Sequence, residues 1–87
     1  MNLRILFFSV LQDITECDEL ELEVPSGVKD IRQLLDFLCD RWPLLRDWRG
    51  KILTAADLRY VGEEHILKDG QEIAIMPPVQ GLSLIHI

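Results

Sequence analysis

The sequence contains few of the residues that mark several common classes of protein. It has only two cysteines, Cys17 and Cys39, which form no C-x-x-C pair. Its two histidines, His65 and His86, lie at no metal-ligand spacing from them. A disulfide-stabilised domain of this size would normally use more cysteines, so we expect reduced thiols in a cytoplasmic protein, and no metal site.

Basic residues and long apolar runs are also scarce. Lys and Arg number 9 against 15 Asp and Glu, which gives a net charge of −6. This charge disfavours nucleic acids and anionic membranes as partners and favours a basic protein surface. No apolar run approaches the roughly 20 residues that cross a bilayer. The first residues have the pattern of a strand with a single Arg4, so we expect no signal peptide.

Short alternating segments dominate the first part of the chain. The whole chain has 87 residues, of which 48% are hydrophobic, so it should form one folded domain. Leu3–Val10 is apolar on both faces, which predicts a central strand or one whose outer face meets a partner. Gln12–Asp18 is polar and turn-like, and Glu19–Val24 alternates with its glutamates outward. That glutamate row is most simply a solvated face, although it could also dock a basic partner.

A single long helix is expected in the middle of the chain. Ser26 or Gly27 can serve as its N-cap, with Asp30 in the first turn, and Pro43 ends it near Trp42. Its apolar positions recur at helical spacing: Val28, Ile31, Leu34, Leu35, Leu38 and Trp42.

The last third predicts short strands that lead to a stiff end. Leu44–Arg49 is expected to be a connector, which can include a short helical turn. Two short strands are expected after it, at Lys51–Ala55 and Asp57–Val61. An Asp-Gly turn at Gly70 leads into a final strand that ends at Met76. Two prolines follow, and because proline lacks a backbone donor they should end the strand and begin a narrow arm.

This order of elements predicts an α+β protein with the β-grasp, or ubiquitin-like, arrangement. We expect a mixed sheet of four to five strands with one main helix packed across one face. Leu3, Ile5 and Phe7 should face that helix. Phe8 and Met76, together with Leu6, should share the open face, either as a contact surface for a partner or under neighbouring loops.

Several motifs at matching spacing resemble one family. They are Arg4-Ile5-Leu6-Phe7-Phe8, Val28-x-x-Ile31-x-x-Leu34, Leu67-Lys68-Asp69-Gly70-Gln71-Glu72-Ile73-Ala74 and Met76-Pro77-Pro78-Val79-Gln80-Gly81. Each motif alone is common, but the set resembles the MoaD type of sulfur carrier, the small subunit of molybdopterin synthase. The resemblance extends from about Leu3 to Gly81, nearly the whole chain.

The resemblance implies a chemistry carried by the chain end. Proteins of this family end in Gly-Gly, and an adenylylating activating enzyme uses ATP on that carboxylate, which then becomes a thiocarboxylate. The arm enters the large synthase subunit, where its sulfur builds the dithiolene of molybdopterin. Gly81 would then lie in the sulfur-bearing region, and the sites of partner binding would be Phe8, Met76, Pro77, Pro78, Val79 and Gln80. No permanently bound cofactor or metal is implied.

The sequence departs from the family pattern after Gly81. Leu82 stands where the second glycine is expected, and the apolar segment 82–87 follows. We therefore expect a carrier domain at 1–81 and an atypical segment at 82–87 that leaves sulfur transfer inactive. The segment could be foreign to the domain, which we favour, a natural extension that is trimmed, or a sign that sulfur transfer has been lost.

Two other functions fit the same fold. One is a sulfur carrier for thiazole synthesis or transfer-RNA thiolation, although the Pro-Pro-Val run favours molybdopterin synthase. The other is a non-catalytic ubiquitin-like interaction module, which the missing diglycine would suit. Among single residues, Cys39 is expected to border the core and His65 to be solvated or locally bonded.

Overall fold

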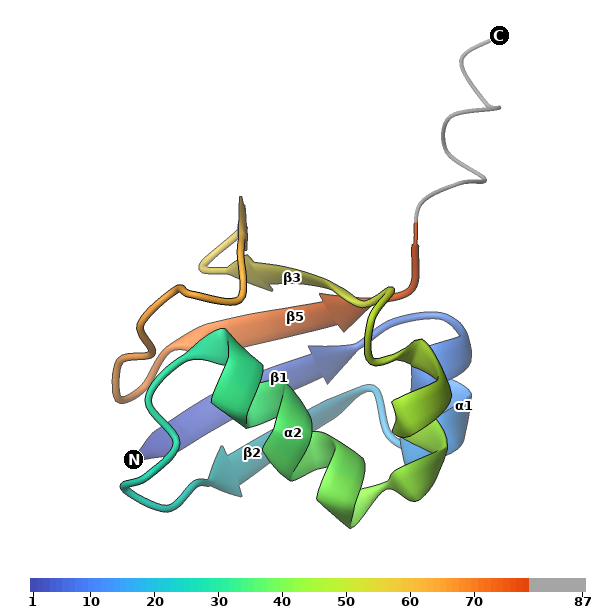
Figure 1. Cartoon of the computed structure of the whole chain (residues 1–87), viewed down its shortest axis with the longest axis horizontal. Helices are drawn as coiled ribbons and strands as arrows, with labels where there is room; N and C mark the ends of the chain where they lie inside the picture. The colour runs from blue at the N-terminus through green and yellow to red at the C-terminus, as the bar shows by residue number, and fades with distance from the viewer. Residues whose placement is uncertain (79–87) are drawn as a thin grey trace, which may run out of the picture.

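The computed structural model describes residues 1–78 as a five-stranded mixed sheet with one main helix across one face (Figure 1). Its elements in chain order are β1 (Asn2–Phe7), α1 (Val10–Thr15), β2 (Glu19–Glu23), α2 (Ile31–Arg41), the 3-10 helix η1 (Pro43–Trp48), β3 (Leu53–Ala56), β4 (Arg59–Val61) and β5 (Glu72–Met76). The strand order is β2-β1-β5-β3-β4, in which only β1 and β5 run parallel. The expected α+β β-grasp is therefore confirmed.

The core lies between the sheet and α2. Leu3, Ile5 and Phe7 of β1 are buried on one face, as their alternation predicted. Ile5 is the partner of Ile73 on β5 in the parallel ladder, and Ile73 is also fully buried. The inner face of the two middle strands thus joins the apolar stripe of α2 in one cluster. The buried residues of α2 are Ile31, Leu34, Leu35, Leu38 and Cys39.

The first strand ends earlier than the sequence predicted. We expected a strand to Val10 and a polar turn over Gln12–Asp18, whereas β1 ends at Phe7 and Val10–Thr15 forms α1. Ser9 adopts a positive φ of 58° and reverses the chain. Leu11 is fully buried, so tertiary burial stabilises a helix that is too short to show a periodic pattern of its own.

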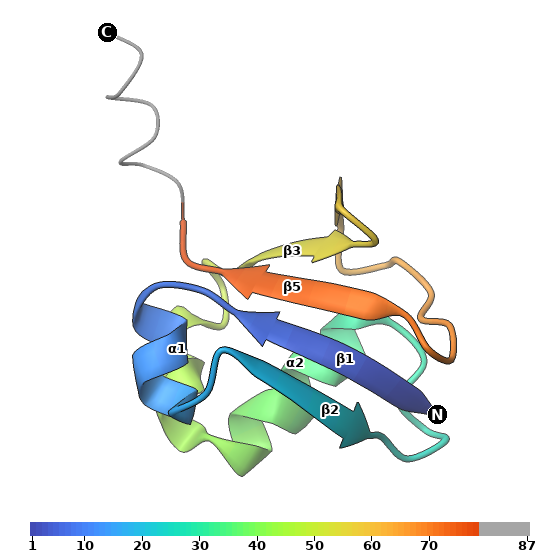
Figure 2. The same cartoon turned by 180° about the vertical axis from the view of Figure 1, so that it is seen from behind.

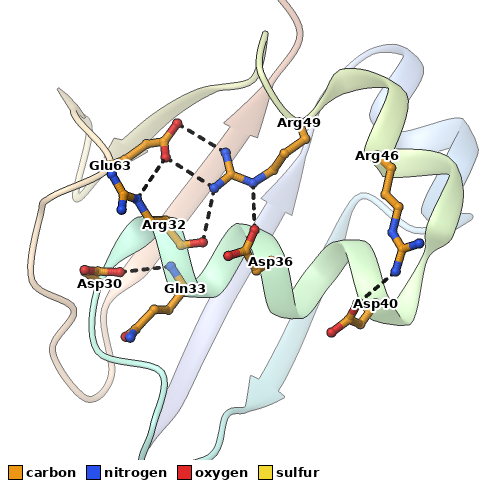
Figure 3. Close-up of polar contacts among 8 residues, drawn as sticks. All are labelled: Asp30, Arg32, Gln33, Asp36, Asp40, Arg46, Arg49 and Glu63. Atoms are coloured by element: carbon orange, nitrogen blue, oxygen red, sulfur yellow. Dashed lines mark hydrogen bonds and ion pairs between the residues drawn. The ribbon is translucent and has the colours of Figure 1, made fainter.

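The main helix begins later than predicted, and its expected N-cap was wrong. Asp30, and not Ser26 or Gly27, is the N-cap of α2, and its side chain accepts a 2.9 Å hydrogen bond from the Gln33 backbone N–H (Figure 3). Its C-terminal end agrees with the prediction, because the helix stops at Arg41 before Pro43. Asp30 therefore satisfies a backbone donor that the first helical turn leaves unpaired.

The later elements follow the predicted order. The connector forms η1, and the two short strands β3 and β4 pair as an antiparallel hairpin. The Asp-Gly turn is present, with Gly70 at a φ of 81°, a conformation that glycine adopts without steric cost. Among the helices of residues 1–78, none combines the length and the apolar character needed to cross a membrane.

Candidate functional site

The site is built around the end of β5, a strand held on both sides. β5 pairs with β1 in parallel and with β3 in antiparallel orientation. Ile73 and Ile75 are fully buried, and the Phe8 backbone N–H donates a 3.2 Å hydrogen bond to the Ile75 carbonyl oxygen. Met76, the last residue of the strand, is the partner of Leu53 on β3. The base of the predicted arm is therefore fixed within the body.

Pro77 and Pro78 follow β5 directly and are half-buried. Neither has a backbone N–H to continue the ladder, and each has a fixed φ. The red segment after β5 turns away from the sheet in both views (Figures 1 and 2). The predicted launching point of the arm is therefore present. Val79, Gln80, Gly81 and Leu82 lie outside the described residues, and their predicted roles stay predictions.

The face of the sheet away from α2 carries an apolar groove beside this point. In Figure 2 the sheet lies in front of α2, and among residues 1–78 no element crosses it. Phe8 is 45% exposed and lies here with Leu6 and Met76, which confirms that these three residues share the open face. The groove has a volume of about 240 Å³, and we call it the open-face groove. It is lined by Leu6, Phe8, Ala55, Leu58, Tyr60, Glu72, Ala74 and Met76.

Leu58 and Tyr60 form one wall of this groove, and neither was expected there from the sequence. Both belong to the β3–β4 hairpin, which stands out from the sheet beyond β3 (Figures 1 and 2). Leu58 is 91% exposed and Tyr60 is 68% exposed. The sequence predicts one continuous strand over Asp57–Val61, whereas β4 begins at Arg59. A turn at Asp57-Leu58 gives no sequence signal, because this position normally favours Asn-Gly or Asp-Gly.

The tip of the hairpin is held by contacts to the start of β5. Asp57 and Leu58 have φ values of 50° and 73°. The Asp57 carboxylate accepts hydrogen bonds from Gln71 Nε2 at 3.2 Å and from the Glu72 backbone N–H at 3.4 Å. A left-handed leucine costs roughly 1–2 kcal/mol relative to ordinary backbone geometry. The buried Gln71 side chain and β5 therefore keep Leu58 in an unfavourable conformation.

The chemistry of the groove suits binding and offers little for catalysis. Its only ionisable side chains are Glu72 and Tyr60. The pKa shifts lie elsewhere: burial raises the pKa of the Cys39 thiol, and a hydrogen bond to Glu63 raises the pKa of Arg49. Within residues 1–78, no three His, Cys, Asp or Glu side chains gather in a way that could hold a metal ion. An apolar surface next to the end of a strand that is paired on both sides is the main feature of the site.

The fold defines a class, the ubiquitin-like β-grasp proteins. Solved structures of this class resemble the chain closely. One is a putative molybdopterin converting factor subunit 1 from Pyrococcus furiosus, with a TM-score of 0.77 at 24% identity over 90% of this chain and 98% of that one. Another is subunit 1 in a complex with subunit 2 of the molybdopterin-converting factor from Helicobacter pylori. It has a TM-score of 0.63 at 23% identity over 90% of this chain and 95% of that one.

The sequence relationship is more specific than the fold. The sequence profile of the ThiS family matches residues 5–81, so the chain belongs to the ThiS family. A relative in Escherichia coli, the molybdopterin synthase sulfur carrier subunit, is 37% identical in an alignment of 82 positions that covers 91% of this chain and 98% of that protein. This relationship confirms the resemblance found in the sequence. The segment 82–87 lies beyond the matched residues, and the division at residue 81 stays a prediction.

Proposed function

We propose that this chain is the sulfur-carrying small subunit of molybdopterin synthase. The observation that carries the proposal is the placement of β5, a strand bonded on both sides that ends at Met76 beside the open-face groove and is followed by Pro77 and Pro78. A chain end that leaves so firmly held a strand can be presented to another protein. The end-to-end similarity to a sulfur carrier subunit supports the same function.

In this proposal the chain contributes its own C-terminus as the reacting group. An adenylylating activating enzyme uses ATP to form an acyl-adenylate at a terminal glycine, and a sulfur donor then displaces AMP to leave a thiocarboxylate. The chain carries this sulfur to the large synthase subunit. Glycine at the end suits the reaction, because the absence of a Cβ lets the carboxylate approach a nucleotide closely.

The described part of the chain would position that reaction. Phe8 and Met76 supply apolar contacts with the partner at the base of the arm. Pro77 and Pro78 restrict the arm before it binds, which lowers the entropy lost on insertion. Val79, Gln80 and Gly81 would follow the prolines into the partner. An arm one residue too short would miss by about 3.3–3.6 Å, which is decisive when reacting atoms must come within about 3–3.5 Å.

The proposal is tested on a chain that ends Gln80-Gly81-Gly. Incubation with an activating enzyme, ATP and a sulfur source should replace one terminal oxygen by sulfur, which intact-mass spectrometry detects. The product should then convert the pterin precursor to molybdopterin when the large subunit is added.

Two controls make the result specific. The same chain without ATP should keep its original mass, and so should the chain that ends at Ile87, because a β-branched residue replaces the terminal glycine. A Gly-Gly chain that acquires sulfur yet supports no molybdopterin formation would point to another sulfur-transfer pathway. A Gly-Gly chain that acquires no sulfur at all would contradict the carrier function.

A further inference from the structure

Leu58 presents an apolar side chain that the body of the protein does not use. It is 91% exposed at the tip of the β3–β4 hairpin, and it lines the open-face groove opposite the core. Its φ of 73° places it at the second position of a two-residue turn, where glycine or asparagine is favoured. Leucine is therefore unfavourable here for two reasons: its backbone conformation is strained, and its apolar side chain is exposed to water. Within residues 1–78, no other residue covers this side chain.

The tip is held in place, so Leu58 is presented in a fixed position. The Asp57 backbone N–H donates a 3.0 Å hydrogen bond to the Glu72 carbonyl oxygen, and its carboxylate accepts from Gln71 and Glu72. The Gln71 side chain is itself buried and accepts a 3.1 Å hydrogen bond from the Lys68 backbone N–H. Because these bonds fix the backbone of the turn, little backbone entropy is lost when a partner covers Leu58.

The reach of the arm limits where the partner can lie. The five residues from Pro77 to Gly81 span at most about 17–18 Å when fully extended. A protein that encloses the end of this arm must therefore approach the sheet close to Met76. Met76 lines the open-face groove together with Leu58, so the same partner would cover both residues.

The charge at the groove indicates the chemistry of that partner. Glu72 lies on the groove, and its carboxylate makes no ion pair with any residue in 1–78. Its cross-strand neighbour Arg4 is paired instead with Glu19 at 3.4 Å and Glu21 at 3.6 Å. An apolar side chain flanked by a lysine or arginine would complement both the wall of the groove and this carboxylate.

We propose that Leu58 is a partner-specificity residue. Resting on the sulfur-carrier function proposed above, Leu58 forms with Tyr60 the wall of a groove that receives an apolar side chain of the large synthase subunit. A basic side chain of that subunit lies next to it and faces Glu72. The docking surface then extends from the base of the arm onto the hairpin tip.

The test distinguishes a role of Leu58 in binding from a role in folding, because one substitution should weaken binding without lowering the melting temperature. In a chain ending Gln80-Gly81-Gly, Leu58→Asn removes the apolar contact but suits a positive φ. Its melting temperature should be unchanged or higher, while its Kd for the cognate large subunit, measured by isothermal titration calorimetry, should rise about tenfold or more. Leu58→Met keeps an apolar side chain and should bind almost as the parent does.

A matched control is available on another surface. Leu44 is 65% exposed on η1 and does not line the groove, so Leu44→Asn should leave the Kd unchanged. Equal Kd values for the parent and Leu58→Asn would overturn this inference while leaving the proposed function intact. A parent chain that neither acquires sulfur nor binds the large subunit would overturn both.

The same variants identify any other occupant of the groove. Kd values for the activating enzyme and self-association by analytical ultracentrifugation are measured in parallel. If Leu58→Asn weakens only the activating-enzyme complex, or only self-association, the groove serves that contact and the assignment to the large subunit is wrong. A lower melting temperature for Leu58→Asn would show that Leu58 serves the fold, and this too would overturn the proposal.

Discussion

Neighbouring residues of β5 point to opposite faces of the sheet and have different roles. Ile73 and Ile75 are fully buried against the core, whereas Ala74 and Met76 line the open-face groove. Truncating a buried isoleucine to alanine typically costs about 2–5 kcal/mol of stability. The outer residues have no comparable contacts within the described body. Substitutions at alternate positions of one strand should therefore separate loss of folding from loss of binding.

Cys39 gives a prediction about pH at the level of one side chain. It is 5% exposed on α2, and burial is the largest cause that raises the pKa of its thiol, against an opposing effect of Arg49. The thiol therefore ionises at lower pH in the unfolded chain, near its ordinary pKa of about 8.5. The stability it contributes is complete below that pH and is lost as pH rises through the higher pKa of the folded state.

We therefore expect the free energy of unfolding of the parent to fall more steeply above about pH 8.5 than that of Cys39→Ala. Urea denaturation of both proteins at a series of pH values measures the difference between the two slopes. Because all other ionisable groups are shared, they cancel in the comparison. Parallel curves for the two proteins would contradict the prediction.

At the scale of elements, alternating and periodic segments could be predicted from the sequence, and segments fixed by distant contacts could not. The middle of α2 has a clear apolar stripe. Its start is displaced because Asp30 forms a bridge with Ile66, while the Lys29 carbonyl accepts a 2.8 Å hydrogen bond from Leu67 N–H. Extended pairing with a segment more than thirty residues away keeps these residues out of the helix, and no local pattern encodes it.

In the candidate site, too, the residues with a local sequence pattern could be predicted and those fixed by distant contacts could not. Phe8 and Met76 could be predicted because each lies on a strand with a clear face. Leu58 and Tyr60 could not, because β4 has only three residues and the turn before it lacks glycine. Its conformation depends on the Asp57 contacts to the start of β5, which become visible only when the strands are paired.

Arg49, which follows η1, joins α2 to the segment after β4 through one side chain, and we predict that it stabilises their packing. Its guanidinium contacts Asp36 at 3.1 Å and both carboxylate oxygens of Glu63 at 3.2 Å, and it donates a 3.4 Å hydrogen bond to the Arg32 carbonyl oxygen (Figure 3). The Arg49 side chain is 23% exposed, so water screens this network only in part. Arg49→Met should lower the free energy of unfolding by about 1–2 kcal/mol, measured by urea denaturation.

Arg46 provides the matched control for that measurement. It makes a single 3.0 Å ion pair with Asp40, and both side chains are more than half exposed. Such exposed pairs typically contribute about 0–1 kcal/mol, so Arg46→Met should change stability by less than about 0.5 kcal/mol. Equal effects of the two substitutions would show that the Arg49 network adds nothing beyond an ordinary surface pair.

At the scale of the whole molecule, the two faces of the sheet have different roles. One face packs against α2 to form the core, and the other is open for contact with a partner. α2 covers one face and supplies much of the core, so the other face can remain open without exposing the core to water (Figures 1 and 2). β5 contributes to both faces, because Ile73 and Ile75 are part of the core while Ala74 and Met76 line the open-face groove. A net charge of −6 adds a long-range attraction for a basic partner.

The prolines at the base of the arm give a prediction about the complete carrier. If Pro77 and Pro78 restrict the free arm, replacing both by glycine increases the entropy lost on insertion by about 1–2 kcal/mol. The Kd for the large subunit should then rise roughly 5- to 30-fold in a chain ending Gln80-Gly81-Gly. The melting temperature should change little, because Pro77 and Pro78 lie after the last paired strand and glycine loosens the folded and the unfolded chain alike there.

A glycine substitution at a proline in an exposed loop distinguishes arm stiffness from a general effect on the chain. Pro25 precedes α2 in an exposed loop, far along the sequence from the arm. Pro25→Gly should lower stability by about 0.4–1 kcal/mol by loosening the unfolded chain, and it should leave the Kd unchanged. The two variants thus have opposite signatures, loss of affinity at the arm and loss of stability in the loop. If the arm variant binds as tightly as its parent, its prolines merely end β5, and partner affinity depends on the sheet face alone.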